Sequence, residues 1–379
     1  MDAIRFIERE AAAYDEEAVK KAKLERLTEK AVRGVQAAKK PGASAPDRLA
    51  CGCAGTQVRT LAQESVGQDA PAQPGRLRNW PVQLQLVPVR APYFDGCDLL
   101  IAVGCRFSDR VALNPKTFAK NATIIQIDID ASELGKNVDV DLAIVGDAAY
   151  VLNAMLPMIE DKKHPDWIKM IHEWQAQDYH PVSDASRLMP HQVIGEVCNQ
   201  CGPEAVYVTD VGQHQMWAAQ YIRHTKSRGF ITSGGLGTMG FGYGAAIGAQ
   251  MALGRDQRVV MFTGDGSFHM NLNEACTAVS YELPIITVIF NNSVLGMVRQ
   301  WQELFYDRRY SFTELKNPDF GLIARGNGIA YRCVERRGEL PQAVAAMKAH
   351  AGAYLLEVRV ENEENVFPVS YTHLRAHET

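Results

Sequence analysis

Four apolar runs of strand length restrict what the C-terminal half of this chain can fold into. They are EAVYVTDVG (204–212), RVVMFTGDG (258–266), LPIITVIFNN (283–292) and AYLLEVRV (353–360), and helical stretches lie between them. Strands that are apolar throughout, rather than alternating, are typical of a parallel sheet with helices on both faces. The sequence therefore predicts a doubly wound α/β domain over residues 189–369. In such sheets ligands bind at the carboxyl ends of the strands.

A second, smaller α/β region precedes this domain. CDLLIAVGCRF (97–107) and NATIIQIDID (121–130) predict strands, and DLAIVGDAAYVLNAML (141–156) predicts a strand followed by a helix. So few strands cannot form a complete doubly wound sheet, so we interpret residues 97–155 as a partial α/β domain. Residues 156–188 predict a helical linker.

The ends of the chain are harder to interpret. Helical spacing of apolar residues predicts a helix over residues 1 to about 40, which we take as a surface helix rather than one that seeks a partner. Residues 41–95 are interrupted by PGASAP, CGCAG and APAQPG and predict no ordered domain, so residues 1–96 remain unassigned. We hypothesise that residues 41–95 and the tail at 370–379 derive from a reading-frame error or splice. Resequencing across these joins tests that.

Composition excludes several classes of function. The formal net charge of −4 provides no basic field for nucleic acid. The charged N-terminus does not suit a signal peptide, and the longest apolar run, 283–290, is too short to span a membrane. We expect a cytoplasmic protein with no nucleic-acid or membrane partner. Cys198 and Cys201 have a zinc-ligand spacing, but no second pair accompanies them, so ordinary reduced thiols are expected.

The strongest motif joins two strand ends. Gly264-Asp265-Gly266-Ser267 closes one predicted strand, and Asn292 closes the next one, 27 positions after Asp265. A helix predicted over about 271–281 lies between them, and a right-handed crossover should return Asn292 to the same edge of the sheet as Asp265. One carboxylate and one amide oxygen suit Mg²⁺ bound to a diphosphate, and the glycines let backbone approach the anion. The alternative is a pair of solvated turns.

Two other segments are compatible with an anion site. Val211-Gly212-Gln213-His214-Gln215 follows a strand and precedes a predicted helix, so its N–H groups can face an anion, although a polar helix cap is an equal alternative. Ser233 to Gly240 is glycine-rich and leads into the small-residue helix GYGAAIGAQMAL. Met239 in this segment can be explained from the residues alone as a packing residue of the hydrophobic core.

The segment from Gly264 to Asn292 resembles the diphosphate-binding motif of thiamine-diphosphate enzymes, which begins with GDG and ends with NN. The resemblance implies the thiamine-diphosphate-binding fold, with Mg²⁺ ligated by Asp265, Asn292 and the backbone carbonyl of Val294. It implies that GQHQ contacts the diphosphate and that Met239 supports the bent cofactor beneath its thiazolium ring. The cofactor-binding residues implied are Val211, Gly212, Gln213, His214, Gly237, Met239, Gly264, Gly266 and Ser267.

A narrower resemblance rests on LGMVRQWQELFY (295–306) and the later NPDF (317–320). These look like the acetolactate synthase pattern, which implies a carboligase that condenses pyruvate with a second 2-keto acid in branched-chain amino acid biosynthesis. Met297 and Trp301 would then line the pocket for the second keto acid, and the indole would favour an acceptor with one more methyl by roughly 1 kcal/mol. The alternative is an amphipathic helix with Trp301 in the core.

The partial domain carries a matching segment, GCRFSDRV (104–111), which resembles the region that binds FAD in this family. The resemblance implies contacts from Gly104 and Arg106, with Arg110 holding the acceptor carboxylate through its guanidinium fork. Ser108 replaces the usual aspartate. Asp128 and Asp147 match acids near the flavin, although solvated strand ends explain them almost as well. The family also implies a homo-oligomer and a regulatory subunit as partners.

Two rival functions remain open. One is a related thiamine-diphosphate decarboxylase or oxidase, which shares GDG and NN but need not share the segment around Trp301; product analysis with pyruvate separates acetaldehyde from acetolactate. The other is a non-catalytic cofactor-binding protein that pairs with a full-length subunit.

Family members carry a pyrimidine-binding domain whose glutamate protonates the cofactor's aminopyrimidine, and no segment here resembles it. None of Glu8, Glu10, Glu16 or Glu17 has a matching context. We therefore predict that the purified chain binds Mg²⁺–thiamine diphosphate weakly and turns over little or no pyruvate. An acetolactate assay checks this, and robust product formation would contradict it.

Overall fold

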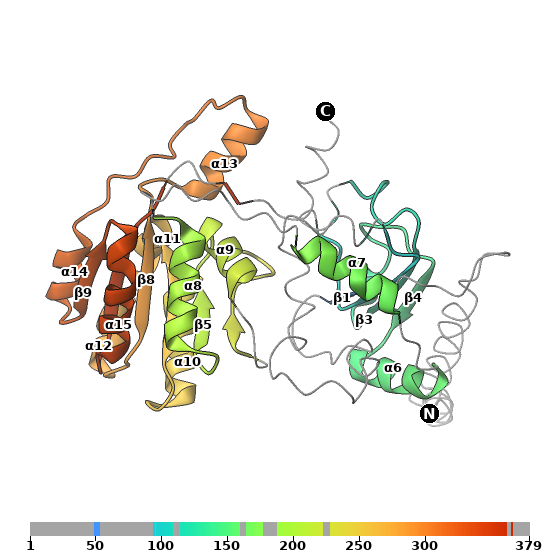
Figure 1. Ribbon diagram of the computed structural model, residues 1–379, viewed down its shortest axis with the longest axis horizontal. Coiled ribbons are helices and arrows are strands. Elements are labelled where there is room, and N and C mark those ends of the chain that lie inside the picture. The colour runs from blue at the N-terminus through green and yellow to red at the C-terminus, as the bar shows by residue number, and fades with distance from the viewer. Residues whose placement is uncertain are drawn as a thin grey trace, which may run out of the picture. The chain divides into compact units, whose positions relative to one another are not determined.

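The computed structural model describes residues 49–53, 94, 96–108, 112, 114–159, 164–176, 188–222, 228–361 and 365–366, the first of these ranges by its backbone. The chain divides into two compact units, with the main division between Tyr179 and His180. Figure 1 labels the elements of both units. The helix expected over residues 1–40 and the tail at 370–379 lie outside the described residues. In the part of the chain that the structure describes, no helix has the length and apolar content needed to cross a bilayer.

The N-terminal unit is built on a four-stranded parallel sheet in the order β1-β2-β3-β4. The strands are β1 (Leu49–Cys53), β2 (Leu99–Val103), β3 (Thr123–Asp128) and β4 (Leu142–Val145). The last three are the predicted ones. The first was not expected: part of the segment taken to carry no ordered domain pairs with β2, because strand pairing depends on a partner rather than on local periodicity alone.

Helices cover both faces of this sheet. Trp167 of α7 (Pro165–Ala176) packs with Leu100 and Ile124 on one face. On the other face, Met155 of α6 (Ala148–Met155) packs with Ile101. Two short 3₁₀ turns, η1 (Ala131–Glu133) and η2 (Leu156–Met158), complete the unit. The predicted helical linker contains α7.

The C-terminal unit is a six-stranded parallel sheet in the order β6-β5-β7-β8-β10-β9. Its strands are β5 (Val206–Thr209), β6 (Phe230–Ile231), β7 (Val259–Gly264), β8 (Ile286–Asn291), β9 (Ala330–Val334) and β10 (Tyr354–Arg359). The doubly wound α/β fold expected from the sequence is confirmed. The four predicted strands are β5, β7, β8 and β10; the short β6 and the half-buried β9 were missed because neither is a long apolar run.

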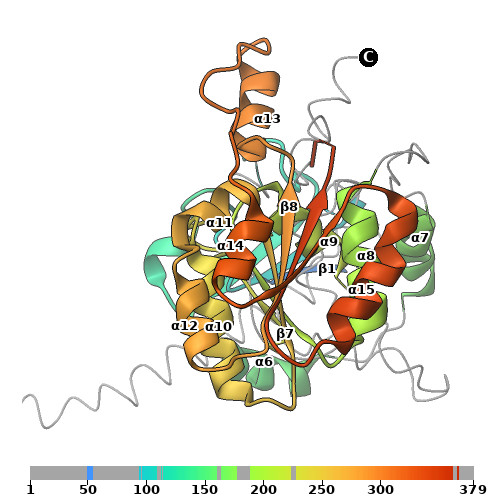
Figure 2. The ribbon, with the colours of Figure 1, turned by 90° about the vertical axis from the view of Figure 1, so that its left-hand side faces the viewer.

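Helices cover this second sheet on both faces, as Figure 2 shows. One face carries α8 (Pro190–Cys201), α9 (Gln213–Tyr221) and α15 (Leu340–Ala349), preceded by the 3₁₀ turn η3 (Arg337–Glu339). The other face carries α10 (Phe241–Leu253), α11 (Asp265–Asn271), α12 (Glu274–Ser280) and α14 (Phe320–Gly326). All six residues of β8 are buried, because each face of the strand is covered by a helical layer.

One further helix, α13 (Gly296–Phe305), lies beyond the end of β8 and projects from the sheet (Figure 2). Only Gln300 of this helix is buried. The helix expected over about 271–281 corresponds to α12. The preceding helix α11, which begins at Asp265 itself and is separated from α12 by a break at residues 272–273, was not expected. The motif thus lies in the first turn of a helix rather than in a loop.

The order of the strands places a change of direction beside β5. From β5 the chain passes to β6 on one side and then to β7 on the other. Such a switch point opens a crevice at the carboxyl ends of the strands, where ligands of doubly wound sheets bind.

The centre of the sheet generates a stability prediction. Phe262 is fully buried on β7, its ring centroid 6.0 Å from that of Tyr207 and 5.9 Å from that of Phe290. Because Phe262→Ala leaves a cavity in a closed core, we expect a loss of about 3–5 kcal/mol in unfolding free energy. Phe312, which is 98% exposed, is the control, and Phe312→Ala should cost less than about 0.5 kcal/mol. Urea denaturation followed by circular dichroism measures both, and equal effects would contradict the packing described.

Candidate functional site

The site is centred on Asp265, the first residue after β7. Gly264 pairs with Phe290 in the parallel register, so the turns that follow β7 and β8 leave the sheet side by side. Asp265 is 2% exposed. Its Oδ1 accepts a hydrogen bond from Gly266 N at 2.9 Å, and its Oδ2 accepts from Ser293 N at 2.8 Å. The carboxylate is therefore bonded to the residue that follows Asn292. Asp265 and Asn292 lie at the same edge of the sheet, as the sequence predicted.

The turn after β8 is tightly constrained. Ser293 has φ +57°, which is uncommon for a residue with a side chain. Asn292 Oδ1 accepts from Val294 N at 3.2 Å, so the side chain stabilises its own turn. Val294 forms an isolated antiparallel bridge with Glu314. The two bridge bonds use Ser293 O and Leu295 N, so neither uses the Val294 carbonyl.

Two glycines leave no room for a side chain. A Cβ at Gly266 would lie 2.7 Å from Leu295 Cδ2, and one at Gly296 would lie 2.1 Å from Gln213 Oε1. The Gly266 position is also 3.9 Å from the methyl carbon of Met239. The structure thus brings Met239 from the glycine-rich segment to the GDG turn. Gly237 lies in the same segment with φ +66° and faces Val211, whose Cγ1 is 3.9 Å from the position of its absent Cβ.

The turn after β5 is organised by Asp210, a buried carboxylate that no sequence motif indicated. Its Oδ1 accepts from Val211 N at 2.7 Å and from Gly240 N at 2.8 Å, and its Oδ2 accepts from Gly242 N at 3.0 Å. These bonds attach the start of α10 to the end of β5. A Cβ at Gly242 would lie 2.9 Å from Asp210, which explains the small residue at that position.

His214 lies in the first turn of α9, with its ring between the Gly212 and Gly264 positions. Burial lowers the pKa of His214 to about 4, while Asp210 acts in the opposite direction through its charge and a backbone hydrogen bond. The ring is therefore neutral near pH 7. Its Nε2 is buried and has no hydrogen-bond partner within the described residues.

Two predicted residues are engaged in local contacts. Gln213 Nε2 donates to Gln300 Oε1 of α13 at 2.8 Å, so its amide is directed toward that helix. Ser267 Oγ donates to the Val211 carbonyl at 2.7 Å, and this bond connects the turns after β7 and β5. Ser267 keeps its acceptor capacity, but its proton is already used.

The electrostatics of the site suit a cation. Burial raises the pKa of the Asp265 carboxyl above its ordinary value, against hydrogen bonds from Asn317, Gly266 and Ser293 and the electrostatic influence of His269, which lower it. The hydrogen-bond donors are neutral, so a bound cation would stabilise the buried charge further. Among the described residues, no three His, Cys, Asp or Glu side chains form a metal cluster. The oxygens present fit Mg²⁺, which takes one or two protein side chains and fills its octahedron with phosphate and water.

The helix α13 carries the two residues expected at the second-substrate pocket. Met297 is half-buried and packs against the core cluster that α8, α9 and α15 cover. Trp301 is half-buried too, and its ring stacks on Phe305 with centroids 5.1 Å apart. Trp301 is therefore not a core residue, because only Gln300 of this helix is fully buried.

The expected flavin residues lie in the N-terminal unit. Gly104 follows β2 with φ +60°, and Arg106 is exposed beyond it. Asp128 Oδ1 accepts from Asp130 N at 2.9 Å, and Asp147 caps α6 by accepting from Tyr150 N at 2.9 Å. Both acids thus have local structural partners. Arg110 lies outside the described residues.

Sequence reasoning missed one residue at the centre of the site. Asn317 donates through Nδ2 to Asp265 Oδ2 at 2.8 Å and to Asn291 Oδ1 at 3.0 Å. Its Oδ1 lies 2.9 Å from His269 Nε2. In the sequence, Asn317 stands out only as the first residue of NPDF. Its separation from Asp265, 52 residues with no spacing rule, gave no signal that the two meet.

Comparisons with known proteins agree with this geometry. The model of the C-terminal TPP binding domain of thiamine pyrophosphate enzymes matches residues 210–358, which include every turn described above in the second unit. The model of the central domain of the same enzymes matches residues 87–155.

Individual relatives are similar over the same region. The acetolactate synthase isozyme 2 large subunit of Escherichia coli (strain K12) is 44% identical over 281 residues, covering 72% of this chain and 50% of the relative. The acetolactate synthase large subunit of Porphyra purpurea is 42% identical, covering 72% and 47%. A probable acetolactate synthase large subunit of Methanocaldococcus jannaschii is 40% identical, covering 71% and 47%. The chain thus spans about half the length of the curated relatives it matches.

The role of Asp210 generates a prediction. An asparagine has one acceptor oxygen, so Asp210→Asn must direct its NH₂ group at one or two of the three backbone N–H donors. We expect a loss of about 1–3 kcal/mol in unfolding free energy. Asp256→Asn is the control, since Asp256 is exposed in the loop before β7. If chemical denaturation shows no difference between the two variants, Asp210 does not anchor α10 as described.

Proposed function

The chain belongs to the thiamine pyrophosphate enzyme family, and from this membership we propose that its C-terminal unit binds Mg²⁺ and thiamine diphosphate at the carboxyl ends of β5, β7 and β8. The observation that carries the proposal is the 2.8 Å hydrogen bond between Asp265 Oδ2 and Ser293 N. It holds the buried carboxylate against the turn that contains Asn292 and Val294.

In this proposal three groups of the chain are ligands of the cation. Asp265 supplies the negative charge, and Asn292 Oδ1 and the Val294 carbonyl supply neutral oxygens. Gly266 and Gly296 let the turns pack closely together, since a Cβ at either would meet a neighbouring side chain. Val211, Gly212, Gly237 and Gly264 line the approach for the diphosphate. Met239 would support the cofactor from the side of the GDG turn.

The reaction proposed is that of an acetolactate synthase, the condensation of pyruvate with a second 2-keto acid. When bound, thiamine diphosphate supplies the carbon nucleophile and electron sink for decarboxylation. The chain's part is to hold and orient it, because catalytic positioning depends on fixed geometry. The half-buried Met297 and Trp301 lie on α13, at the same end of the sheet as Asn292, where they would contact the acceptor keto acid.

Other parts of the proposal rest on the family alone. Arg110 would hold the acceptor carboxylate, and Gly104, Arg106, Asp128 and Asp147 would lie near FAD. The division into a central domain at 97–155, a linker at 156–188 and a cofactor domain at 189–369 is proposed on the same basis. So is a homo-oligomer. A regulatory subunit is proposed as a further partner, in keeping with the names of the relatives, which specify a large subunit.

The cation site generates a prediction. Asp265→Asn removes the one formal charge offered to Mg²⁺ while keeping the size of the side chain, so affinity should fall by on the order of 100-fold, about 2.7 kcal/mol. Calorimetric titration of Mg²⁺ into the full chain with thiamine diphosphate present measures this. The exposed Asp256, at the opposite end of the same strand, is the control, and Asp256→Asn should leave affinity unchanged. Equal affinities in the two variants would overturn the assignment.

A further inference from the structure

Glu357 is a charged residue inside the sheet, in the interior of β10. It is 3% exposed and pairs with Ile289 of β8 and Cys333 of β9 in the parallel register. A buried carboxylate is costly unless hydrogen bonds and charge compensate it. Its Oε1 accepts from Asn291 Nδ2 at 2.7 Å, and its Oε2 accepts from Tyr331 Oη at 2.5 Å. The largely exposed Arg359 lies 3.5 Å from Oε1.

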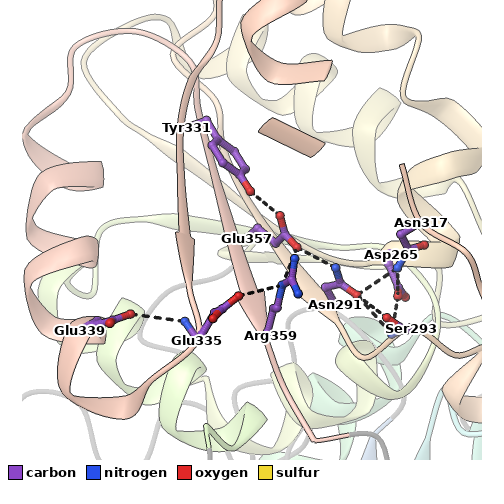
Figure 3. Close-up of polar contacts among 9 residues, drawn as sticks. All are labelled: Asp265, Asn291, Ser293, Asn317, Tyr331, Glu335, Glu339, Glu357 and Arg359. Atoms are coloured by element: carbon purple, nitrogen blue, oxygen red, sulfur yellow. Dashed lines mark hydrogen bonds and ion pairs between the residues drawn. The ribbon is translucent and has the colours of Figure 1, made fainter. Parts of the chain in front are cut away.

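Figure 3 shows that these contacts continue to the cation site. Asn291 turns its nitrogen to Glu357 and its Oδ1 to the turn after β8. That oxygen accepts from Ser293 N and Ser293 Oγ, each at 3.2 Å, and from Asn317 Nδ2 at 3.0 Å. Ser293 N and Asn317 Nδ2 are the two groups that also donate to Asp265 Oδ2. Glu357 thus reaches Asp265 through one asparagine and two shared donors.

The direction of each hydrogen bond in this network follows from the carboxylates at its two ends, Glu357 and Asp265. An ionised carboxylate only accepts hydrogen bonds, whereas an amide both donates and accepts. Facing Glu357, Asn291 must present its NH₂ group, so its oxygen must face Ser293 and Asn317. If the amide turned over, its NH₂ group would face the three donors of Ser293 and Asn317, and its oxygen would face the Glu357 carboxylate, so neither side could form its hydrogen bonds.

We propose that Glu357 is a positioning residue for the cation and diphosphate site, because it fixes the orientation of Asn291 and thereby of the Ser293 and Asn317 donors on Asp265. Glu357 touches neither the cation nor the diphosphate. The inference rests on the proposed function for its ligand, but its structural part, the order of the Ser293 N–H, is independent of any ligand.

A glutamine at position 357 tests the polarity without changing the shape. In Glu357→Gln the new NH₂ group can donate to Asn291 Oδ1, so the amide is free to turn over. Loss of an outer partner of a metal ligand typically weakens metal affinity 10–100-fold, and we expect a loss of about tenfold in Mg²⁺ affinity with thiamine diphosphate present. Hydrogen exchange at the Ser293 amide, followed by NMR without ligand, should accelerate.

Restoring the polarity by a second change separates positioning from general stability. In the double variant Glu357→Gln with Asn291→Asp, the new carboxylate accepts from the introduced glutamine amide on one side and from Ser293 and Asn317 on the other. Mg²⁺ affinity and Ser293 protection should return to within about threefold of the parent. Asn291→Asp alone places two carboxylates face to face and should be the least stable of the three.

Gln250 provides a matched control. It is 1% exposed, donates to the carbonyls of Gly254 and Gln257, and accepts from Val259 N at the opposite end of β7 from Asp265. Gln250→Leu should lower the melting temperature while leaving Mg²⁺ affinity and Ser293 exchange unchanged.

The outcomes are distinct. Unchanged Ser293 exchange in Glu357→Gln, equal loss of affinity in Gln250→Leu, or a double variant that restores nothing would each overturn the positioning role. If the parent chain itself binds no Mg²⁺ and thiamine diphosphate, the proposed function falls, and the Ser293 exchange rates still decide whether Glu357 orders the turn.

Discussion

The hydrogen bond from the Ser293 backbone to the Asp265 carboxylate is the interaction on which the rest of the site depends. It joins the turns after β7 and β8, which the parallel register already places side by side. Through it a carboxylate from one strand is held beside the amide oxygen and backbone carbonyl that follow the next strand. Because the donor belongs to the backbone of a turn with φ +57°, the arrangement requires this particular turn and not only these residues.

Three buried carboxylates belong to this sheet and the turns that follow it. Each accepts its hydrogen bonds from neutral donors, and Glu357 is also paired with Arg359. Asp210 binds backbone N–H groups at the start of α10, Asp265 binds Gly266, Ser293 and Asn317, and Glu357 binds Asn291 and Tyr331. Backbone and amide donors satisfy hydrogen bonding without neutralising charge. The hydrogen bonds on Asp265 therefore leave a formal charge at a buried position, where a divalent cation gains most from it.

The same residues serve the fold and the site together. Ser267 connects two turns, Gln213 connects α9 to α13, and Asn292 stabilises the turn in which it lies. A rigid edge of this kind is expected where a ligand with a fixed geometry is bound, since ordering the groups beforehand removes an entropic cost from binding.

The sequence by itself determined the class of fold and the positions of the main motifs. Short apolar runs that end in Gly, Asp or Asn favour buried strands. The 27-residue separation of Asp265 and Asn292 fits one helical crossover and one strand, which returns both residues to one edge of a parallel sheet. Local pattern also marked Gly266 and Met239. It could not reveal that Asn317 bridges Asp265 and Asn291, that Asp210 anchors α10, or that Glu357 sets the direction of Asn291, because those contacts join residues between 26 and 66 positions apart. Only the tertiary structure decided them, since the direction of a buried hydrogen bond depends on which groups the packing of separate strands brings face to face.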